Sequence, residues 1–307
     1  MSELTLINYI RRNFPQRQNA IVQGIGDDAM VFENGYVVST DSFVEGIHFD
    51  FKYFTPYNLG YHCMGASLSD LAAMSAKPIC TLVSLFIPHN TKDRELKQLY
   101  HGFKCICQRY KCDISGGDII ESPFWGLTIT VIGNTKNPLL RSGAKPGDFL
   151  YTTNYLGLAE TGRIALSRGY SKNLFRQSIK KHLYPEPRID ESLKLRQFVH
   201  SGIDTSDGLS TDAFHIAEES KVKIVIENVP IHPEVKLLIE KEKLSPFDFI
   251  LSAGEDFELL ITGKITKKIS GITLFKIGRI LEGKGLYLSY GGRLKKIHPT
   301  GYEHLKK

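Results

Sequence analysis

Apolar and polar positions in the first half of the chain alternate between strand-like and helix-like spacing. Short apolar runs at residues 36–40, 82–87 and 127–132 are typical of strands, and the first is expected to end at Asp41. Residues 57–75 and 94–110 have the length and spacing of helices. Alternation of this kind predicts an α/β or α+β layer.

The second half begins after a turn-rich stretch, residues 133–147, which contains two prolines and three glycines. Beyond it the pattern predicts strands at 149–153, 223–226, 258–262 and 274–280, and helices at 157–168 and 211–220. We therefore predict two domains, residues 1–138 and 139–307, in agreement with the usual ~100–200 residues per domain.

The composition is that of an ordinary globular protein, 42% hydrophobic and 23% charged. No apolar run approaches the ~20 residues that a membrane helix requires, and the start of the chain lacks the blocks of a signal peptide. We therefore expect a cytoplasmic protein with no membrane partner. The basic residues behind the net charge of +6 gather at 171–182 and near the C-terminus, without interleaved aromatic residues. This favours a solvated basic face over a nucleic-acid site.

The cysteines form no recognisable framework. Their number, five, is odd, which fits a reducing compartment better than a disulfide scaffold. Cys105, Cys107 and Cys112 are close in sequence but include no CxxC pair and have no distant second pair. Core or surface thiols are therefore favoured over a zinc site.

Aspartates recur among glycine, small or apolar neighbours. They lie in five segments, GIGDDAM (24–30), STDSFVEGIHF (39–49), SLSDLAAM (67–74), SGGDII (115–120) and GIDTSDGL (202–209). Burying an unpaired carboxylate costs several kcal/mol, so such residues must be paired, neutralised or bound to metal. No basic residue stands beside them in the sequence. Magnesium would resolve the mismatch, because it takes oxygen ligands and is usually shared between carboxylates and substrate phosphates.

The alternative is that these aspartates are turn formers and helix caps, the usual role of Asp beside Gly or Ser. Asp204 is expected to end a short strand, and Asp207 could cap the helix that follows. Asp70 fits the alternative poorly, because it lies within an apolar helical run with no exposed polar face. We therefore interpret Asp70 as a metal ligand.

The usual nucleotide-binding signatures are missing from the sequence. It contains neither a Walker A motif nor the protein-kinase set of Gly-rich loop, HRD and DFG segments. Phosphates are therefore expected at residues 115–118, whose glycines allow close backbone approach, and at Arg141.

Taken together, the motifs resemble those of the thiamine-monophosphate kinase family. The resemblance rests on GIGDDA, STDSFVEGIHF, SLSDLAAM, GGD, RSGAKPGD, IDTSDGLSTD and GEDFEL in this order, and it extends to GYEHL at 301–305. The family shares a superfamily with aminoimidazole ribonucleotide synthetase, selenophosphate synthetase and a hydrogenase maturation protein. The resemblance implies a two-domain α/β (α+β) fold of the aminoimidazole ribonucleotide synthetase type. Its N-terminal domain binds ATP and metal and dimerises through its sheet, and its C-terminal domain closes over nucleotide and substrate.

The resemblance also implies a reaction and a set of site residues. The reaction is direct, Mg²⁺-dependent, in-line transfer of the ATP γ-phosphoryl group to thiamine monophosphate, without a side-chain base, in a homodimer. Several Mg²⁺ ions are implied, and a need for K⁺ is left open. The implied metal ligands are Asp28, Ser39, Thr40, Asp41, Asp70, Asp118, Asp204 and Asp207. ATP would contact Gly117, Asp118, Arg141 and Ser206, and thiamine monophosphate would contact His48, Glu255 and Tyr302.

A sister enzyme of the superfamily and a nucleotide sensor are the two alternative functions. A sister enzyme of the superfamily is disfavoured because the first cysteine, Cys63, falls well after GIGDD and the chain ends in two lysines rather than cysteine. A nucleotide sensor without turnover is disfavoured because every aspartate motif is intact. Tyr184 and Ala253 depart from the family pattern near the expected substrate loops. The roles of Asp27, Asp256 and the cysteines are not assigned.

Overall fold

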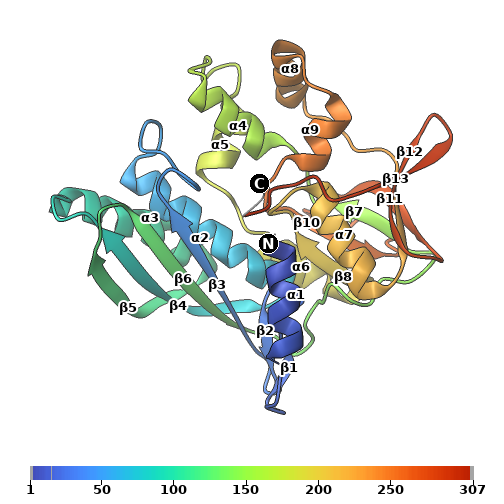
Figure 1. Cartoon of the computed structure of the whole chain (residues 1–307), viewed down its shortest axis with the longest axis horizontal. Helices are drawn as coiled ribbons and strands as arrows, with labels where there is room; N and C mark the ends of the chain where they lie inside the picture. Colours follow the sequence, from blue (N-terminus) through green and yellow to red (C-terminus); the bar gives the residue numbers. More distant parts are fainter. Residues whose placement is uncertain (1–2, 15, 305–307) are drawn as a thin grey trace.

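The N-terminal half forms a six-stranded sheet covered by helices on one face. A computed structural model describes residues 3–14 and 16–304 (Figure 1). The strands, in the order β1-β2-β3-β6-β4-β5, are β1 (Ile21–Gln23), β2 (Met30–Phe32), β3 (Tyr36–Val44), β6 (Gly126–Asn134), β4 (Lys77–Ile87) and β5 (Asp113–Glu121). All neighbours are antiparallel except β4 and β5. The expectations made for residues 1–2 and 305–307 lie outside the described residues.

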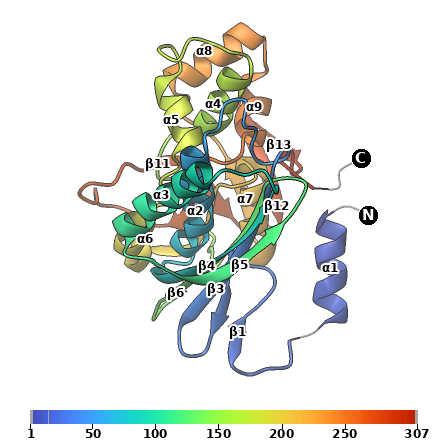
Figure 2. The ribbon, with the colours of Figure 1, turned by 90° about the vertical axis from the view of Figure 1, so that its left-hand side faces the viewer.

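Helices α2 (Pro56–Ala73) and α3 (Asp93–Tyr110) cover one face of this sheet, as the turned view in Figure 2 shows. Thr55 caps α2 by accepting from the backbone N–H of Asn58, and Pro56 occupies its first turn. The helix is buried along almost its whole length, because elements of both halves of the chain pack around it. Gly60 on α2 and Gly102 on α3 let the two helices approach closely. A Cβ on Gly60 would lie 2.1 Å from the Leu99 carbonyl oxygen.

The C-terminal half contains a seven-stranded sheet in the order β13-β12-β9-β11-β7-β10-β8. Its strands are β7 (Phe149–Thr152), β8 (Val199–Asp204), β9 (Lys223–Ile226), β10 (Leu259–Gly263), β11 (Phe275–Leu281), β12 (Gly285–Tyr290) and β13 (Arg293–Ile297). The helices of this half are α4 (Leu158–Ser167), α5 (Arg176–Leu183), α6 (Ile189–Leu195), α7 (Leu209–Ser220), α8 (Pro233–Glu242) and α9 (Pro246–Ser252). A further helix, α1 (Glu3–Asn13), begins the described chain.

Most of the expected elements are present, with shifted ends. Strand β3 continues through Asp41 to Val44, and β4 begins five residues earlier than expected, at Lys77. The glycine-rich residues 115–118, where phosphates are expected, lie inside β5, at the edge of the sheet. There Gly117 has a φ of +147°, and a Cβ would lie 1.8 Å from the carbonyl oxygen of Val83 on β4. Glycine is therefore required for strand pairing at this position.

The segment between β6 and β7 carries neither helix nor strand and contains the predicted domain boundary at 138/139. Helix α2 contacts both halves of the chain. It packs against β3 and β6 of the first sheet and against β8, α5 and α6 of the second half. None of the helices in the described part of the chain is long and apolar enough to span a membrane. The five cysteines are free thiols, and Cys63, Cys107 and Cys112 are buried.

Candidate active site

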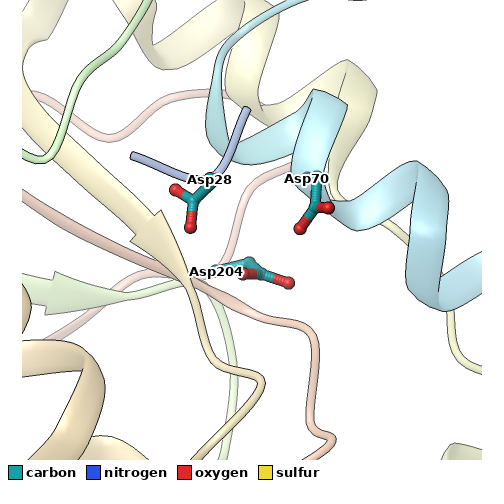
Figure 3. A group of neighbouring side chains, drawn as sticks. All are labelled: Asp28, Asp70 and Asp204. Carbon is teal, nitrogen blue, oxygen red and sulfur yellow. The ribbon is translucent and has the colours of Figure 1, made fainter. Parts of the chain in front are cut away.

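Three carboxylates converge where the two halves of the chain meet. Asp28 lies just before β2, Asp70 in the last turn of α2, and Asp204 at the end of β8, so Asp204 does end a strand (Figure 3). One oxygen atom from each residue lies within 4.8 Å of the others. Sequence positions 28, 70 and 204 are brought together because α2 runs from one sheet to the edge of the other.

Hydroxyl groups orient two of these carboxylates without neutralising them. Ser39 Oγ on β3 donates to Asp70 Oδ2 at 2.6 Å and also lies 3.1 Å from the Asp28 carbonyl oxygen. Ser69 Oγ on α2 donates to Asp204 Oδ2 at 2.5 Å. Asp70 also lies at the C-terminal end of a helix, where the helix dipole disfavours negative charge.

The electrostatics of the cluster disfavour its charged state when no cation is bound. Burial, followed by the nearby charges of Asp41, Asp204 and Asp28, raises the pKa of Asp70 well above its ordinary value. Burial, with a contribution from Asp28, raises the pKa of Asp204 to about 8. Burial also raises the pKa of Asp41 on β3, although a hydrogen bond from Ser67 opposes this. The expected ligand Asp41 therefore belongs to the same electrostatic group.

Arg141 supplies the one guanidinium that the described structure pairs with the cluster. Its Nη2 lies 2.5 Å and its Nε 3.2 Å from Asp28 Oδ1, and its backbone N–H donates to the carboxylate of Asp27. Burial raises the pKa of Asp28, and Arg141 opposes this. Asp28 Oδ2 is buried without a hydrogen-bond partner. One guanidinium among several carboxylates leaves an excess of negative charge and open oxygen ligands, which fits hard divalent cations.

A second group of expected residues lies beside this cluster. The backbone N–H of Glu255 donates to the Ser206 carbonyl oxygen at 2.8 Å, and that of Tyr302 donates to the Asp207 carbonyl oxygen at 3.0 Å. These bonds tie the expected substrate residues to the loop that follows Asp204. Burial raises the pKa of Asp207 to about 6. Asp207 does not cap α7, whose N-cap position is Gly208.

His304 lies beside two of the expected substrate residues. Its ring centroid lies 5.4 Å from that of His48 and 4.8 Å from that of Tyr302. His48 Nδ1 accepts from the backbone N–H of Val44 at 3.1 Å, so Nε2 carries the proton when the ring is neutral. Burial lowers the pKa of His48, which favours the neutral ring.

Three expected site residues are not brought to the cluster in this chain. Gly117 and Asp118 lie on β5, separated from β3 by β6 and β4, a distance of ~14 Å at the usual strand spacing. All residues of β5 are exposed. The Thr40 side chain is exposed on the opposite face of β3 from Ser39 and contacts Thr130 Oγ1 at 3.1 Å.

Sequence reasoning missed several residues that the structure brings to the site. Ser67 and Ser69 precede Asp70 in a buried helix, and the presence of hydroxyls in such a helix is the signal that the sequence offers. His62 and His182 carry no comparable signal, because their neighbours in space are distant in sequence, whereas His304 lies in the GYEHL segment beside Tyr302. Asp256, unassigned from the sequence, accepts from the backbone N–H groups of Gly157 and Ala159 at the start of α4, which is a structural role.

A cavity of about 470 Å³ lies elsewhere, between residues 226–231, 246–251 and 274–276 of the C-terminal half. None of the clustered aspartates lines it. We place the site at the carboxylates, because charge, burial and unpartnered oxygen ligands coincide there.

Comparison with known proteins gives one consistent result. Residues 26–135 match the family model described as AIR synthase related protein, N-terminal domain. A thiamine-monophosphate kinase from Aquifex aeolicus is 30% identical over 99% of this chain and 98% of its own length. One from Buchnera aphidicola subsp. Schizaphis graminum is 37% identical over 87% of this chain and 84% of its own length.

Solved structures agree with the sequence relatives. A structure described as AaThiL complexed with AMPPCP and TMP has a TM-score of 0.90 and 30% identity, covering 99% of this chain and 97% of the other. Escherichia coli HypE, a hydrogenase maturation protein, has a TM-score of 0.72 at 18% identity, covering 98% of both chains, which shows a shared fold.

Replacing Asp70 with asparagine tests the electrostatic account of the cluster. In EDTA we expect Asp70→Asn to unfold at the wild-type temperature or above it, because a neutral amide replaces a carboxyl group whose charged form is disfavoured without a cation. Mg²⁺ at about 100 times its dissociation constant should stabilise the wild type by about 2.7 kcal/mol and the variant by much less. Thermal unfolding with and without Mg²⁺ measures both effects, with the exposed Asp190→Asn as the control. A variant that Mg²⁺ stabilises as strongly as the wild type would contradict the account.

Proposed function

The chain belongs to the thiamine-monophosphate kinase family, within the AIR synthase-related superfamily, and we propose that it transfers the γ-phosphoryl group of ATP to thiamine monophosphate. The products are thiamine diphosphate and ADP. The observation that carries the proposal is the cluster of Asp28, Asp70 and Asp204, whose negative charge exceeds what Arg141 offsets. Such a site suits a reaction between two polyanions that must be brought together.

Magnesium fits the donor set of this site. Asp28, Asp41, Asp70, Asp204 and Asp207, with Ser39, would hold it, and the number of carboxylates supports more than one ion. Bound Mg²⁺ supplies positive charge that offsets the phosphates. Thr40 is left out of the proposed set because its hydroxyl lies on the other face of β3. A requirement for K⁺ stays open, and the cytoplasmic location stays a prediction.

Arg141 and Ser206 would contact ATP. The guanidinium has five N–H donors, and its contacts with Asp28 leave others for phosphate oxygens. The Arg141 side chain therefore connects the metal ligands to the nucleotide. Ser206 lies in the loop that also holds Asp204 and Asp207, so a phosphate at this loop would lie beside the metal ligands.

Glu255, Tyr302 and His48 would recognise thiamine monophosphate. Burial alone would raise the pKa of Glu255, but the His182 contact and the charges of His62 and His48 lower it to about 2. An ionised Glu255 suits the cationic thiazolium, and the Tyr302 ring, 54% exposed, offers an aromatic face to the same cation. The His48 Nε2–H can donate to an acceptor on the substrate.

Direct transfer requires no side-chain base at this site. A phosphate monoester has a second pKa of about 6, so the attacking oxygen is largely deprotonated near pH 7. The lowered pKa of His48 and its fixed Nδ1 contact suit substrate binding better than proton transfer. The protein then contributes positioning and charge compensation.

The exposed edge strand β5 supports a homodimer. Ile114, Ile119 and Ile120 on this strand are 37%, 61% and 43% exposed, and a long exposed apolar edge is a template for pairing with another chain. We propose that a second copy covers β5 and the open face of the sheet. Gly117 and Asp118 would then reach the nucleotide and metals of the neighbouring subunit rather than those of their own.

An assay of the purified protein with ATP, Mg²⁺ and thiamine monophosphate tests the activity. We expect chromatography to show thiamine diphosphate, initial-rate plots to intersect, and protein quenched after incubation with γ-labelled ATP alone to carry no covalent label. Parallel plots with a labelled residue would overturn direct transfer. Turnover of an aminoimidazole precursor in place of thiamine monophosphate would instead indicate a sister enzyme.

Mixing two inactive variants tests the position of Asp118. We expect Asp70→Asn and Asp118→Asn each to abolish turnover. If Asp118 acts in the neighbouring subunit, each mixed dimer has one intact site, so an equal mixture after subunit exchange should recover about a quarter of wild-type activity.

The control is an equal mixture of Asp70→Asn with Asp204→Asn. Both residues belong to one site within one chain, so each mixed dimer has two damaged sites and recovers nothing. A mixture of Asp70→Asn and Asp118→Asn that stays inactive, although size measurements show mixed dimers, would place Asp118 in the site of its own subunit.

A further inference from the structure

Glu255 lies in a constrained loop beside two buried histidines. Its φ is +61°, a left-handed conformation that is uncommon for a residue with a side chain. The loop is held on both sides of Glu255, by the bond from its own N–H to Ser206 and by a bond of 2.9 Å from the Phe257 N–H to the Thr205 carbonyl oxygen. These backbone bonds therefore fix the position of the Glu255 Cα atom, but they do not fix the position of its carboxylate.

His182, in the last turn of α5, is the nearest partner of that carboxylate. Its Nδ1 lies 3.5 Å from Glu255 Oε2, and its side chain is 0% exposed. Neither ring nitrogen has a hydrogen-bond partner within the described residues. A fully buried ring with two unpartnered nitrogens is costly to keep. The cost is reduced if Nδ1–H donates to Glu255 when the carboxylate is drawn in by a bound substrate.

His62, on α2, forms a hydrogen bond with the backbone of His182. Its Nδ1 lies 2.6 Å from the carbonyl oxygen of His182. A carbonyl only accepts, so Nδ1 of His62 carries the proton. The two rings lie 5.5 Å apart, and the Phe54 ring contacts both in edge-on geometry. The bond links α2, which carries Asp70, to the end of α5.

We propose that His182 and His62 are positioning residues for thiamine monophosphate, with His182 directing the Glu255 carboxylate and His62 fixing His182. The inference rests on the proposed function, because Glu255 is there assigned to the cationic ring of the substrate. Neither histidine touches the substrate in this account. Together they connect the carboxylate of Glu255 to α2, the helix that carries the proposed metal ligand Asp70.

The surroundings of Glu255 agree with this role. The titratable groups that face it are His182 on α5, His62 and Cys63 on α2, His48 after β3, Tyr53 before α2 and Arg163 on α4. Arg163 is already paired with Glu160 at 2.6 Å, so its charge is shared. Of these groups, His182 is the one with an ion-pair contact to Glu255.

Paired amide substitutions at His182 test the proposal. The amide of asparagine reaches the position of Nδ1, whereas that of glutamine reaches the position of Nε2. We therefore expect His182→Asn to keep the KM for thiamine monophosphate within about threefold of wild type and His182→Gln to raise it about tenfold or more. The KM for ATP and kcat should change by less than about twofold in both variants. The same order, with smaller effects, is expected for His62→Asn and His62→Gln.

Titration of the Glu255 carboxyl by carbon NMR provides a readout that does not depend on turnover. The pKa of Glu255 should rise in His182→Gln, because the ring nitrogen that lies 3.5 Å from Glu255 Oε2 is lost, and should stay near its wild-type value in His182→Asn, whose amide keeps a donor at that position. This result would stand even if the wild type failed to phosphorylate thiamine monophosphate, so the two failures can be told apart.

Equal KM values for His182→Asn and His182→Gln, or a KM for ATP that rises in parallel with that for thiamine monophosphate, would overturn the proposal. Either outcome would mean that His182 supports the fold as a whole. A Glu255 pKa that is the same in wild type and His182→Gln would overturn it independently of the kinetics.

Discussion

Mutual repulsion among buried carboxylates is the constraint on which this structure depends. Asp28, Asp70 and Asp204 hold oxygens within 4.8 Å of one another, and Arg141 offsets only part of their charge. Burying such a group costs several kcal/mol unless positive charge is supplied. In the proposed function, cations that arrive with the substrate phosphates would supply this charge, so that stability and chemistry would depend on the same electrostatic balance.

Helix α2 makes this arrangement possible. It packs against the first sheet and reaches β8 of the second half, so Asp70 and Ser69 contact residues from both halves of the chain. His62, two turns earlier on the same helix, reaches the end of α5. Asp70 and His62 are thus attached to one helix, and a change in the position of α5 relative to α2 would alter the His62–His182 contact.

The helices, the strands and the buried aspartates could be predicted from the sequence, whereas the contacts between side chains distant in sequence could not. Asp70 stood out because a carboxylate in an apolar helix has few local explanations, and Asp204 was expected at a strand end. The Arg141–Asp28 pair spans 113 residues and has no local signal. The glycines of residues 115–118 did not reveal that this segment is a strand, because glycine serves close strand pairing as well as phosphate approach. The two buried histidines were missed since only the folded chain brings them beside Glu255.

Anomalous diffraction from crystals grown with Mn²⁺ and a non-hydrolysable ATP analogue tests the central claim most directly. The account predicts anomalous peaks at about 2.2 Å from oxygens of Asp28, Asp70 and Asp204, since a divalent cation of this kind binds carboxylates at that range. Bound nucleotide with no anomalous peak at these three carboxylates would contradict it. The excess negative charge would then have to be offset by protonation, and the aspartates would have a structural role.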